Sequence, residues 1–114
     1  MIKNKNELTV TTECDNNGVE TLFLSNLADF PGRNPRLRMF SQADLEVGGE
    51  VAYHVHEGEF ESYYIISGKG LYNDNGKEIE VNPGTVTFTP SGYGHGIKNI
   101  GTEKLVFIAL IVRD

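Results

Sequence analysis

The chain has 114 residues, with 16 acidic and 10 basic side chains that give a formal net charge of −6 at pH 7. A chain of this length is expected to fold as a single domain, residues 1–114, and to bury roughly two thirds of its unfolded surface. The acidic balance and the lack of any basic run argue against nucleic acid and membrane surfaces as partners, because both attract clustered positive charge.

The sequence shows no apolar stretch of membrane length, and Met1 is not followed by the apolar core of a signal peptide. We therefore expect a cytoplasmic protein. The single cysteine, Cys14, agrees with a reducing compartment. We interpret Cys14 as incidental, because no histidine lies near it in the sequence.

The first predicted elements form an N-terminal hairpin. Residues 8–14 and 19–24 have the composition of strands, and residues 15–18 are typical of a turn. Residues 25–35 contain two prolines and a glycine, which favours an irregular arm or a short helical turn at 27–30. Such an arm could cover the mouth of a barrel or simply connect two strands at the surface.

Residues 36–42 form the next predicted strand, with Arg36, Arg38 and Phe40 on one face. If this face points inward, an arginine could hold a substrate carboxylate through paired hydrogen bonds. A solvent-facing side is the favoured alternative, because an inward arginine is costly unless it is paired. Residues 44–49 are expected to form a turn.

The following stretch, residues 48–68, carries side chains that typically bind metals. His54 and His56 point to the same side of an extended strand, with Cα atoms roughly 6.6 Å apart, so their imidazoles can converge on one cation. Glu61 comes five residues later and can fold back to join them beyond a turn at Gly58. This stretch therefore predicts most of a metal site.

Three residues near Glu61 carry polar side chains that could also belong to a site. Glu57 and Glu59 flank the predicted turn, and we interpret both as solvated loop residues. Tyr63 shares the inward face with Glu61 by strand alternation, which makes it the best-placed proton donor or substrate hydrogen-bonding group near a metal. The alternative role for Tyr63 is an aromatic wall of the pocket.

Strands and tight turns continue to the end of the chain. Residues 71–73 and 77–81 flank a hairpin turn at 74–76, residues 82–84 form another turn, and residues 86–89 form a strand that ends at Pro90. The last strand, residues 105–112, is an almost unbroken apolar run. We expect it to be buried on both faces or to pair with another subunit.

The remaining histidine, His95, lies in a second patterned stretch, residues 84–99. The first stretch follows the pattern glycine, five residues, His-x-His, four residues, Glu, six residues and glycine: Gly48, His54, His56, Glu61 and Gly68. The second follows glycine, five residues, Pro-x-Gly, two residues, His, three residues and Asn: Gly84, Pro90, Gly92, His95 and Asn99. In spacing and order the two stretches resemble the paired motifs of the cupin superfamily.

This resemblance implies an all-β fold, a cupin jelly-roll β-barrel, and commonly a homodimer. Many short strands between glycine and proline turns point independently to a β-sandwich or barrel. The resemblance also implies that His95 joins His54, His56 and Glu61 as metal ligands. Three imidazoles and one carboxylate suit one divalent transition metal ion, Mn, Fe, Co, Ni, Cu or Zn, without choosing among them.

The fold leaves several functions open. We expect a metal-dependent enzyme that acts on a small polar carboxylate, carbonyl or sugar, as a decarboxylase, isomerase or dioxygenase. The alternative is a metal-containing module that binds or senses a small ligand without turnover. A purely structural metal is the third interpretation.

Overall fold

The computed structural model describes residues 1–13, 18–24 and 30–114. A 3₁₀ turn, η1 (Lys5–Glu7), precedes the strands, and the described residues contain no helix long and apolar enough to cross a membrane. The strands are β1 (Val10–Glu13), β2 (Val19–Phe23), β3 (Leu37–Leu45), β4 (Glu50–Val55), β5 (Glu59–Ser67), β6 (Gly70–Asp74), β7 (Lys77–Val81), β8 (Val86–Thr89), β9 (Gly94–Asn99) and β10 (Leu105–Arg113).

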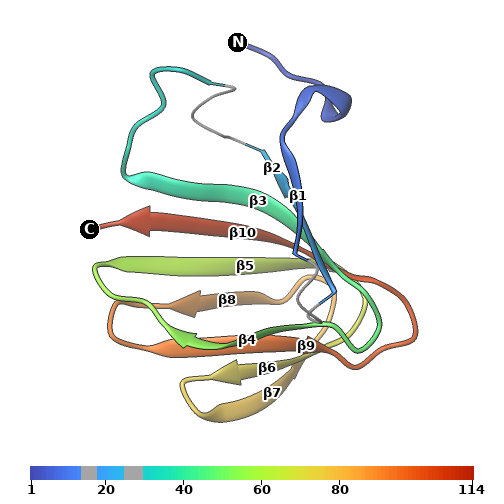
Figure 1. The fold of residues 1–114 in the computed structure, drawn as a ribbon. Helices are drawn as coiled ribbons and strands as arrows, with labels where there is room; N and C mark the ends of the chain where they lie inside the picture. Colours follow the sequence, from blue (N-terminus) through green and yellow to red (C-terminus); the bar gives the residue numbers. More distant parts are fainter. Residues whose placement is uncertain (14–17, 25–29) are drawn as a thin grey trace.

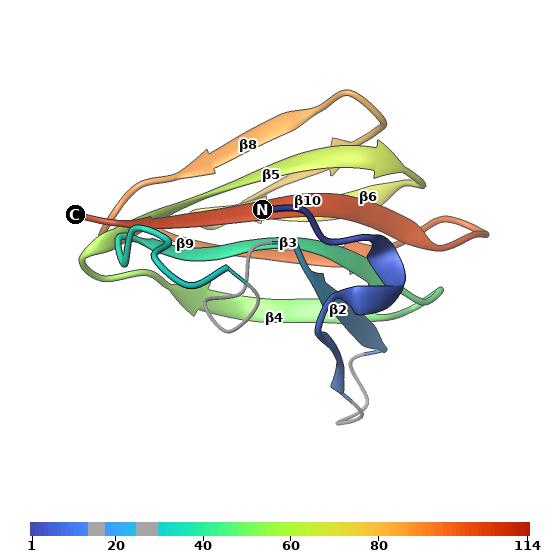
Figure 2. The same ribbon diagram turned by 90° about the horizontal axis from the view of Figure 1, so that it is seen from above.

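The strands form two antiparallel sheets that face each other as the layers of a jelly roll (Figures 1 and 2). The larger sheet has the order β1-β2-β3-β10-β5-β8, and the smaller sheet has the order β4-β9-β6-β7. The expected all-β class is therefore confirmed. Chain neighbours β4 and β5 lie in different sheets, so the turn between them carries the chain from one layer to the other.

The predicted hairpins are present. Strands β1 and β2 pair antiparallel, as do β6 and β7. Asn75 and Gly76, at the tip of the second hairpin, both have positive φ, of 50° and 100°, as a tight two-residue hairpin turn requires. Cys14, most of the predicted turn at 15–18 and the segment 25–29 lie outside the described residues.

Strand β3 continues further than the sequence indicated. Asp44 and Leu45 pair with Val106 and Leu105 of β10, so the turn predicted at 44–49 begins only after Leu45. The prediction was wrong at its first residues because Asp44 has low strand propensity, whereas the central position of β3 between β2 and β10 supplies partners on both sides.

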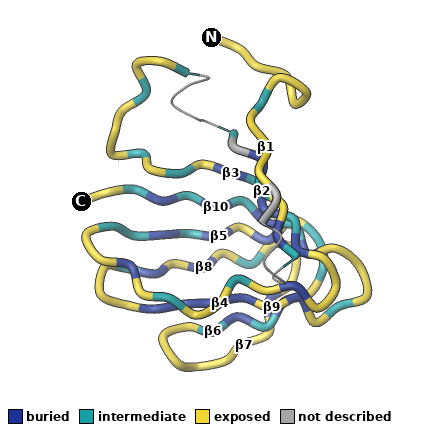
Figure 3. Tube along the Cα trace, in the orientation of Figure 1, coloured by how far each residue is buried: buried dark blue, intermediate teal, exposed yellow. Residues whose placement is uncertain are grey.

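The core lies between the two sheets, and buried residues alternate with exposed ones along the strands (Figure 3). In β10 the inward side chains are fully buried: Leu105, Phe107, Ala109 and Ile111. The outward side chains of this strand are only half-buried: Val106, Ile108, Leu110 and Val112. Burial on both faces, the first of the two arrangements expected for this apolar run, is thus not found in the single chain, and pairing with another subunit stays a prediction.

Two β-bulges change which side chains face the interior. In β4 the pairing moves from Val51↔Ile97 to His54↔His95, which brings two histidines directly opposite each other. In β3 the pairing moves from Met39↔Ile111 to Leu37↔Val112, so Arg38 is an extra residue without a register partner in β10. Bulges of this kind re-aim side chains and are common beside functional sites.

Candidate metal centre

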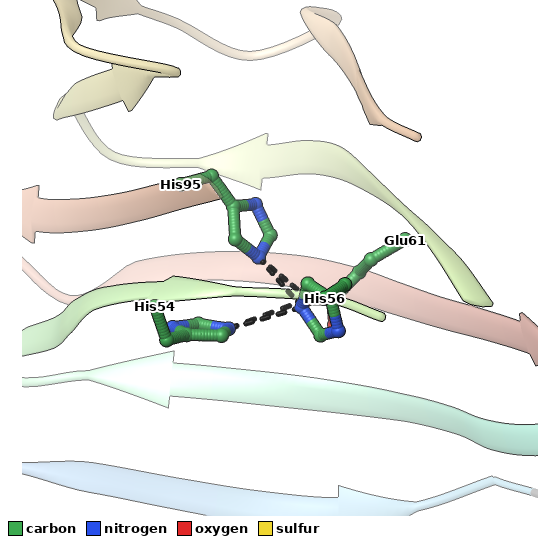
Figure 4. A group of neighbouring side chains, drawn as sticks. All are labelled: His54, His56, Glu61 and His95. Atoms are coloured by element: carbon green, nitrogen blue, oxygen red, sulfur yellow. Dashed lines mark hydrogen bonds and ion pairs between the residues drawn. The ribbon is translucent and has the colours of Figure 1, made fainter. Parts of the chain in front are cut away.

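Three imidazoles and one carboxylate converge on one another in the structure (Figure 4). His54 lies in β4, His56 directly follows that strand, His95 lies in β9 and Glu61 lies in β5. One ligand atom from each of these residues lies within 4.8 Å of those from the others. The four residues predicted as metal ligands are therefore brought together, and we call them the His3Glu cluster.

The distances within the His3Glu cluster fit a single cation. Nε2 of His56 lies 3.0 Å from Nε2 of His54, 3.1 Å from Nε2 of His95 and 2.9 Å from Oε1 of Glu61. Metal bonds of about 2.1 Å at right angles would separate neighbouring ligand atoms by about 3.0 Å. Nε2 of His54 and Oε1 of Glu61 are farther apart, at 4.0 Å, and both would still be within reach of an ion held by the other two residues.

The outer ring nitrogens have partners of their own, which orients each imidazole. Nδ1 of His54 donates to the carbonyl of Ala52 at 2.7 Å, a group in the β4 bulge. Nδ1 of His56 lies 2.9 Å from Oε2 of Glu59. Nδ1 of His95 lies 2.8 Å from the hydroxyl of Tyr72 and 3.1 Å from that of Thr89.

This arrangement is the one that metal-binding histidines use. When Nδ1 carries the proton and donates it to an oxygen, Nε2 is left with a free lone pair. Three such lone pairs and a carboxylate oxygen facing one another at about 3 Å would repel without a positive charge between them. The chemistry of the donor set therefore fits a divalent cation.

The surroundings of His54 favour the neutral form of its imidazole. Burial lowers the pKa of His54 below 6.5, the hydrogen bond to Ala52 opposes this shift, and the nearby His95 and His56 rings add to it. A lowered pKa favours the neutral imidazole, which is the form that binds metals. His54 is also the most exposed member of the cluster, with 39% of its side chain accessible.

Glu59 is not the solvated loop residue that we expected. Glu57 is exposed, as expected for a loop residue, but Glu59 is partly buried at the start of β5 and contacts His56. Its two carboxylate oxygens also accept hydrogen bonds from Nε of Arg38, at 2.9 and 3.1 Å. Burial alone would raise the pKa of Glu59, but the hydrogen bonds from Arg38 and His56 outweigh it and lower the pKa.

The two arginines of the 36–42 segment separate in the structure. Arg36 is exposed, in agreement with the solvent-facing alternative. Arg38 is also exposed, but it lines the cavity beside the His3Glu cluster, although strand alternation places it on the same face as Arg36. The bulge at Arg38 explains the difference, because the extra residue breaks the alternation of β3.

Tyr63 lies where strand alternation placed it, on the inward face with Glu61. It is buried, and its ring centroid is 5.0 Å from that of His95 and 4.4 Å from that of Phe107. Burial first, and then the nearby Glu61 and Tyr72, raise the pKa of Tyr63 well above 10. Tyr63 therefore remains a protonated phenol in the wall of the cavity.

The cavity next to the His3Glu cluster has a volume of about 210 Å³. His54, His56 and Glu61 line one part of it, and the rest of the described wall comes from Val51, Tyr63 and side chains of β2, β3 and β10. A larger hollow of about 550 Å³ lies between the N-terminal segment and strands β1 to β3. None of its described lining residues belongs to the cluster, whereas three members of the cluster line the smaller cavity, which therefore adjoins the candidate metal site.

Residues 41–111 match the family described as Cupin domain. The chain belongs to the cupin family. An oxalate-binding protein from Thermotoga maritima is 40% identical to this cupin over 89 residues, which cover 78% of this chain and 74% of that protein. A crystal structure from the same organism, described as a predicted oxalate decarboxylase, has a TM-score of 0.87 and 36% identity and is covered completely, as is this chain.

Two further similarities are more limited. A glucose-6-phosphate isomerase from Thermococcus onnurineus is 34% identical over 67 residues, and this cupin spans only 35% of its length. An RmlC-like cupin from Shewanella frigidimarina has a TM-score of 0.77 at 16% identity, with 98% of this chain and 89% of that chain covered. At this identity the likeness concerns the fold alone.

Asn99, the last residue of the second cupin motif, stabilises the fold through hydrogen bonds to the backbone. Asn99 is buried, and its Nδ2 donates to the carbonyls of Leu45 at 3.0 Å and Glu103 at 2.8 Å. Its Oδ1 accepts from the backbone of Gly101 at 2.9 Å. Asn99 therefore fastens the end of β3 and the turn before β10, at a distance from the His3Glu cluster along β9.

The outer partners of the histidines were not predicted from the sequence. Glu59, Tyr72 and Thr89 come from three different strands, and no common sequence spacing relates them to the histidines that they contact. Only Glu59 carried a local signal, since it lies three residues after His56 and next to the predicted turn.

Proposed function

We propose that this cupin binds a divalent metal ion at His54, His56, Glu61 and His95 and uses it to hold a small carboxylate in the adjoining cavity. The observation that carries the proposal is the convergence of three Nε2 atoms and one carboxylate oxygen beside a cavity of about 210 Å³. When bound, such an ion supplies positive charge that attracts carboxylate oxygens and stabilises negative charge on them.

The charges around the cavity make a carboxylate ligand dependent on the ion. Among the described residues, Arg38 and Glu61 line the cavity and Glu59 pairs with Arg38, so two carboxylates accompany one guanidinium. A divalent cation reverses this balance locally, although the whole chain has a net charge of −6. We therefore expect carboxylates to bind the metal-loaded protein and not the metal-free protein.

The size of the cavity favours a small ligand. Pockets for drug-sized molecules usually have volumes of about 300–1,000 Å³, and this cavity is smaller. The relative with 40% identity over most of both chains is named an oxalate-binding protein, which makes oxalate the first ligand to test. A sugar phosphate has less support, because the isomerases match only about a third of their length.

Turnover is a second candidate function, favoured by Tyr63. Conversion of oxalate to carbon dioxide and formate breaks the carbon–carbon bond without net oxidation and consumes one proton, which a protonated group near the ligand must deliver. Tyr63 lines the cavity and carries a phenolic proton, so it is the residue that we propose for this role. Binding without turnover remains the alternative.

We also propose a homodimer that covers the outer face of the larger sheet. Apolar side chains accumulate on this face: Phe40, Tyr64, Ile66, Val86, Phe88, Ile108 and Leu110. Exposed strands this apolar invite association. Light scattering should give twice the chain mass of 12.6 kDa, and a monomeric mass would exclude the dimer.

The first experiment is elemental analysis of untagged protein purified without chelator, beside a His56→Ala variant. We expect about one equivalent of a divalent transition metal in the natural sequence and its loss in the variant. Calorimetric titration with oxalate should then show binding to the loaded protein only. Release of formate would establish turnover, and a Tyr63→Phe variant that binds oxalate but forms no formate would support the proton-donor role.

Each candidate has an outcome that would reject it. No metal after reconstitution would reject the metal-dependent function. Metal without any oxalate binding would leave a structural ion. Oxalate binding without formate release, whatever metal is loaded, would leave a binding module.

A further inference from the structure

The guanidinium of Arg38 is only partly engaged by the protein. Its Nε is bound to both oxygens of Glu59, and within the described residues no hydrogen bond holds its terminal amino groups. The side chain is 39% exposed and lines the cavity. Glu59 accepts hydrogen bonds from both Arg38 and His56, which fixes Arg38 beside the His3Glu cluster.

Ser41 gives a second, independent sign of a ligand. It is only 1% exposed, lines the same cavity, and its hydroxyl has no hydrogen-bond partner among the residues that the structure describes. A buried hydroxyl without a partner is destabilising, and proteins rarely retain one without a reason. A ligand oxygen in the cavity would supply the missing partner.

We propose that Arg38 and Ser41 form a distal subsite that selects small dicarboxylates, one carboxylate binding at the His3Glu cluster and the other at this subsite. The inference deepens the proposed function and rests on it. In the distal subsite the terminal amino groups of Arg38 donate to the second carboxylate, and the hydroxyl of Ser41 donates to an oxygen of the ligand.

The geometry of Arg38 suits a carboxylate. A guanidinium presents its donors in a planar fork, so Nε can bind Glu59 while the outer nitrogens bind a second partner. Glu59 also restricts the rotation of the side chain, which reduces the entropy lost when a ligand binds. A lysine would provide charge at this position but could not serve both partners in fixed geometry.

The test compares dicarboxylates with monocarboxylates of equal carbon number. Proteins loaded with Mn²⁺, with metal contents matched by elemental analysis, are titrated by calorimetry with oxalate, malonate and succinate, and with acetate, propionate and butyrate. The natural sequence should prefer at least one dicarboxylate. Arg38→Met should reduce this preference at least tenfold, Arg38→Lys should restore part of it, and Arg36→Met should leave it unchanged.

The preference ratio separates ligand recognition from support of His56 through Glu59. If Arg38→Met weakens mono- and dicarboxylates by the same factor, or leaves both unchanged, the distal subsite is rejected while the proposed carboxylate binding stands. If the loaded natural protein binds no carboxylate at all, the proposed function fails and the distal subsite fails with it.

Ser41→Ala provides a different readout. Removal of an unpartnered buried hydroxyl should leave the melting temperature of the ligand-free protein unchanged or raise it, whereas malonate or oxalate should bind roughly three- to tenfold more weakly. A purely structural serine would not combine these two effects. Unchanged affinity in this variant would remove Ser41 from the subsite.

Discussion

Glu59 accepts a hydrogen bond from Nδ1 of His56 at 2.9 Å, on the side of the ring opposite to the His3Glu cluster. A carboxylate in this position orients the imidazole and makes its free nitrogen a stronger metal ligand. Through this contact Glu59, which the sequence suggests is a loop residue, supports a member of the His3Glu cluster.

We predict that Glu59→Ala weakens metal binding by roughly 10- to 100-fold, because outer partners of metal-bound histidines typically have effects of this size. Competition with a chromophoric chelator measures the affinity. Glu57→Ala is the matched control, since Glu57 is exposed, and it should bind the metal normally. Equal affinities in the two variants would show that the orientation of His56 does not depend on Glu59.

The metal-free protein should become less stable as the pH falls below about 6.5. Burial lowers the pKa of His54 in the folded state, so the unfolded chain takes up this proton first. As far as His54 is concerned, the free energy of unfolding has its full value above the unfolded pKa of about 6.5. It decreases as the pH falls from there towards the lower pKa of the folded state. Urea unfolding at several pH values should show this slope, and His54→Ala should make it shallower. An unchanged slope in that variant would assign the effect to other groups.

Gly68 and Gly84 allow a matched comparison of close packing. Both have φ near +90°, so alanine is strained at either position, by about 1–2 kcal/mol. At Gly68 a Cβ would also lie 2.6 Å from the carbonyl oxygen of Lys104, whereas nothing lies within 4 Å at Gly84. Gly68→Ala should therefore reduce the free energy of unfolding by clearly more than Gly84→Ala in urea titrations. Equal losses would show that the turn before β10 can move aside.

Asn99→Ala should destabilise the fold by about 3 kcal/mol, because it leaves the buried carbonyl of Leu45 and the carbonyl of Glu103 without their donor. Chemical denaturation of the metal-free protein measures this loss. We expect the affinity for metal to change little in the folded variant, since the amide does not contact the His3Glu cluster. A selective loss of metal with normal stability would contradict the structural role.

Prediction from the sequence succeeded where the spacing of residues along a strand or turn determines how their side chains are placed. His54 and His56 share a strand face at any ordinary twist, and the turn at Gly58 returns the chain so that Glu61 meets them. Asn75 and Gly76 were equally decisive, because few other pairs adopt two consecutive positive φ angles. These features are local, so one short stretch of chain contains all their causes.

The features that escaped prediction depend on partners distant in the sequence. Arg38 turns toward the cavity because β10 offers no register partner for it, and nothing near residue 38 reveals this bulge. The outward face of β10 has apolar residues like those of its buried face, so alternation in composition could not indicate its half-exposed position. Sheet register, which long-range pairing determines, was the missing information.

The members of the His3Glu cluster come from both layers of the fold. Glu61 belongs to the larger sheet, whereas His54 and His95 belong to the smaller one. An ion bound by all of them would act as a clasp between the two sheets, much as a disulfide joins separate segments. Loss of the ion would remove this link between the sheets, so the availability of metal would affect the stability of the folded chain as well as what it binds.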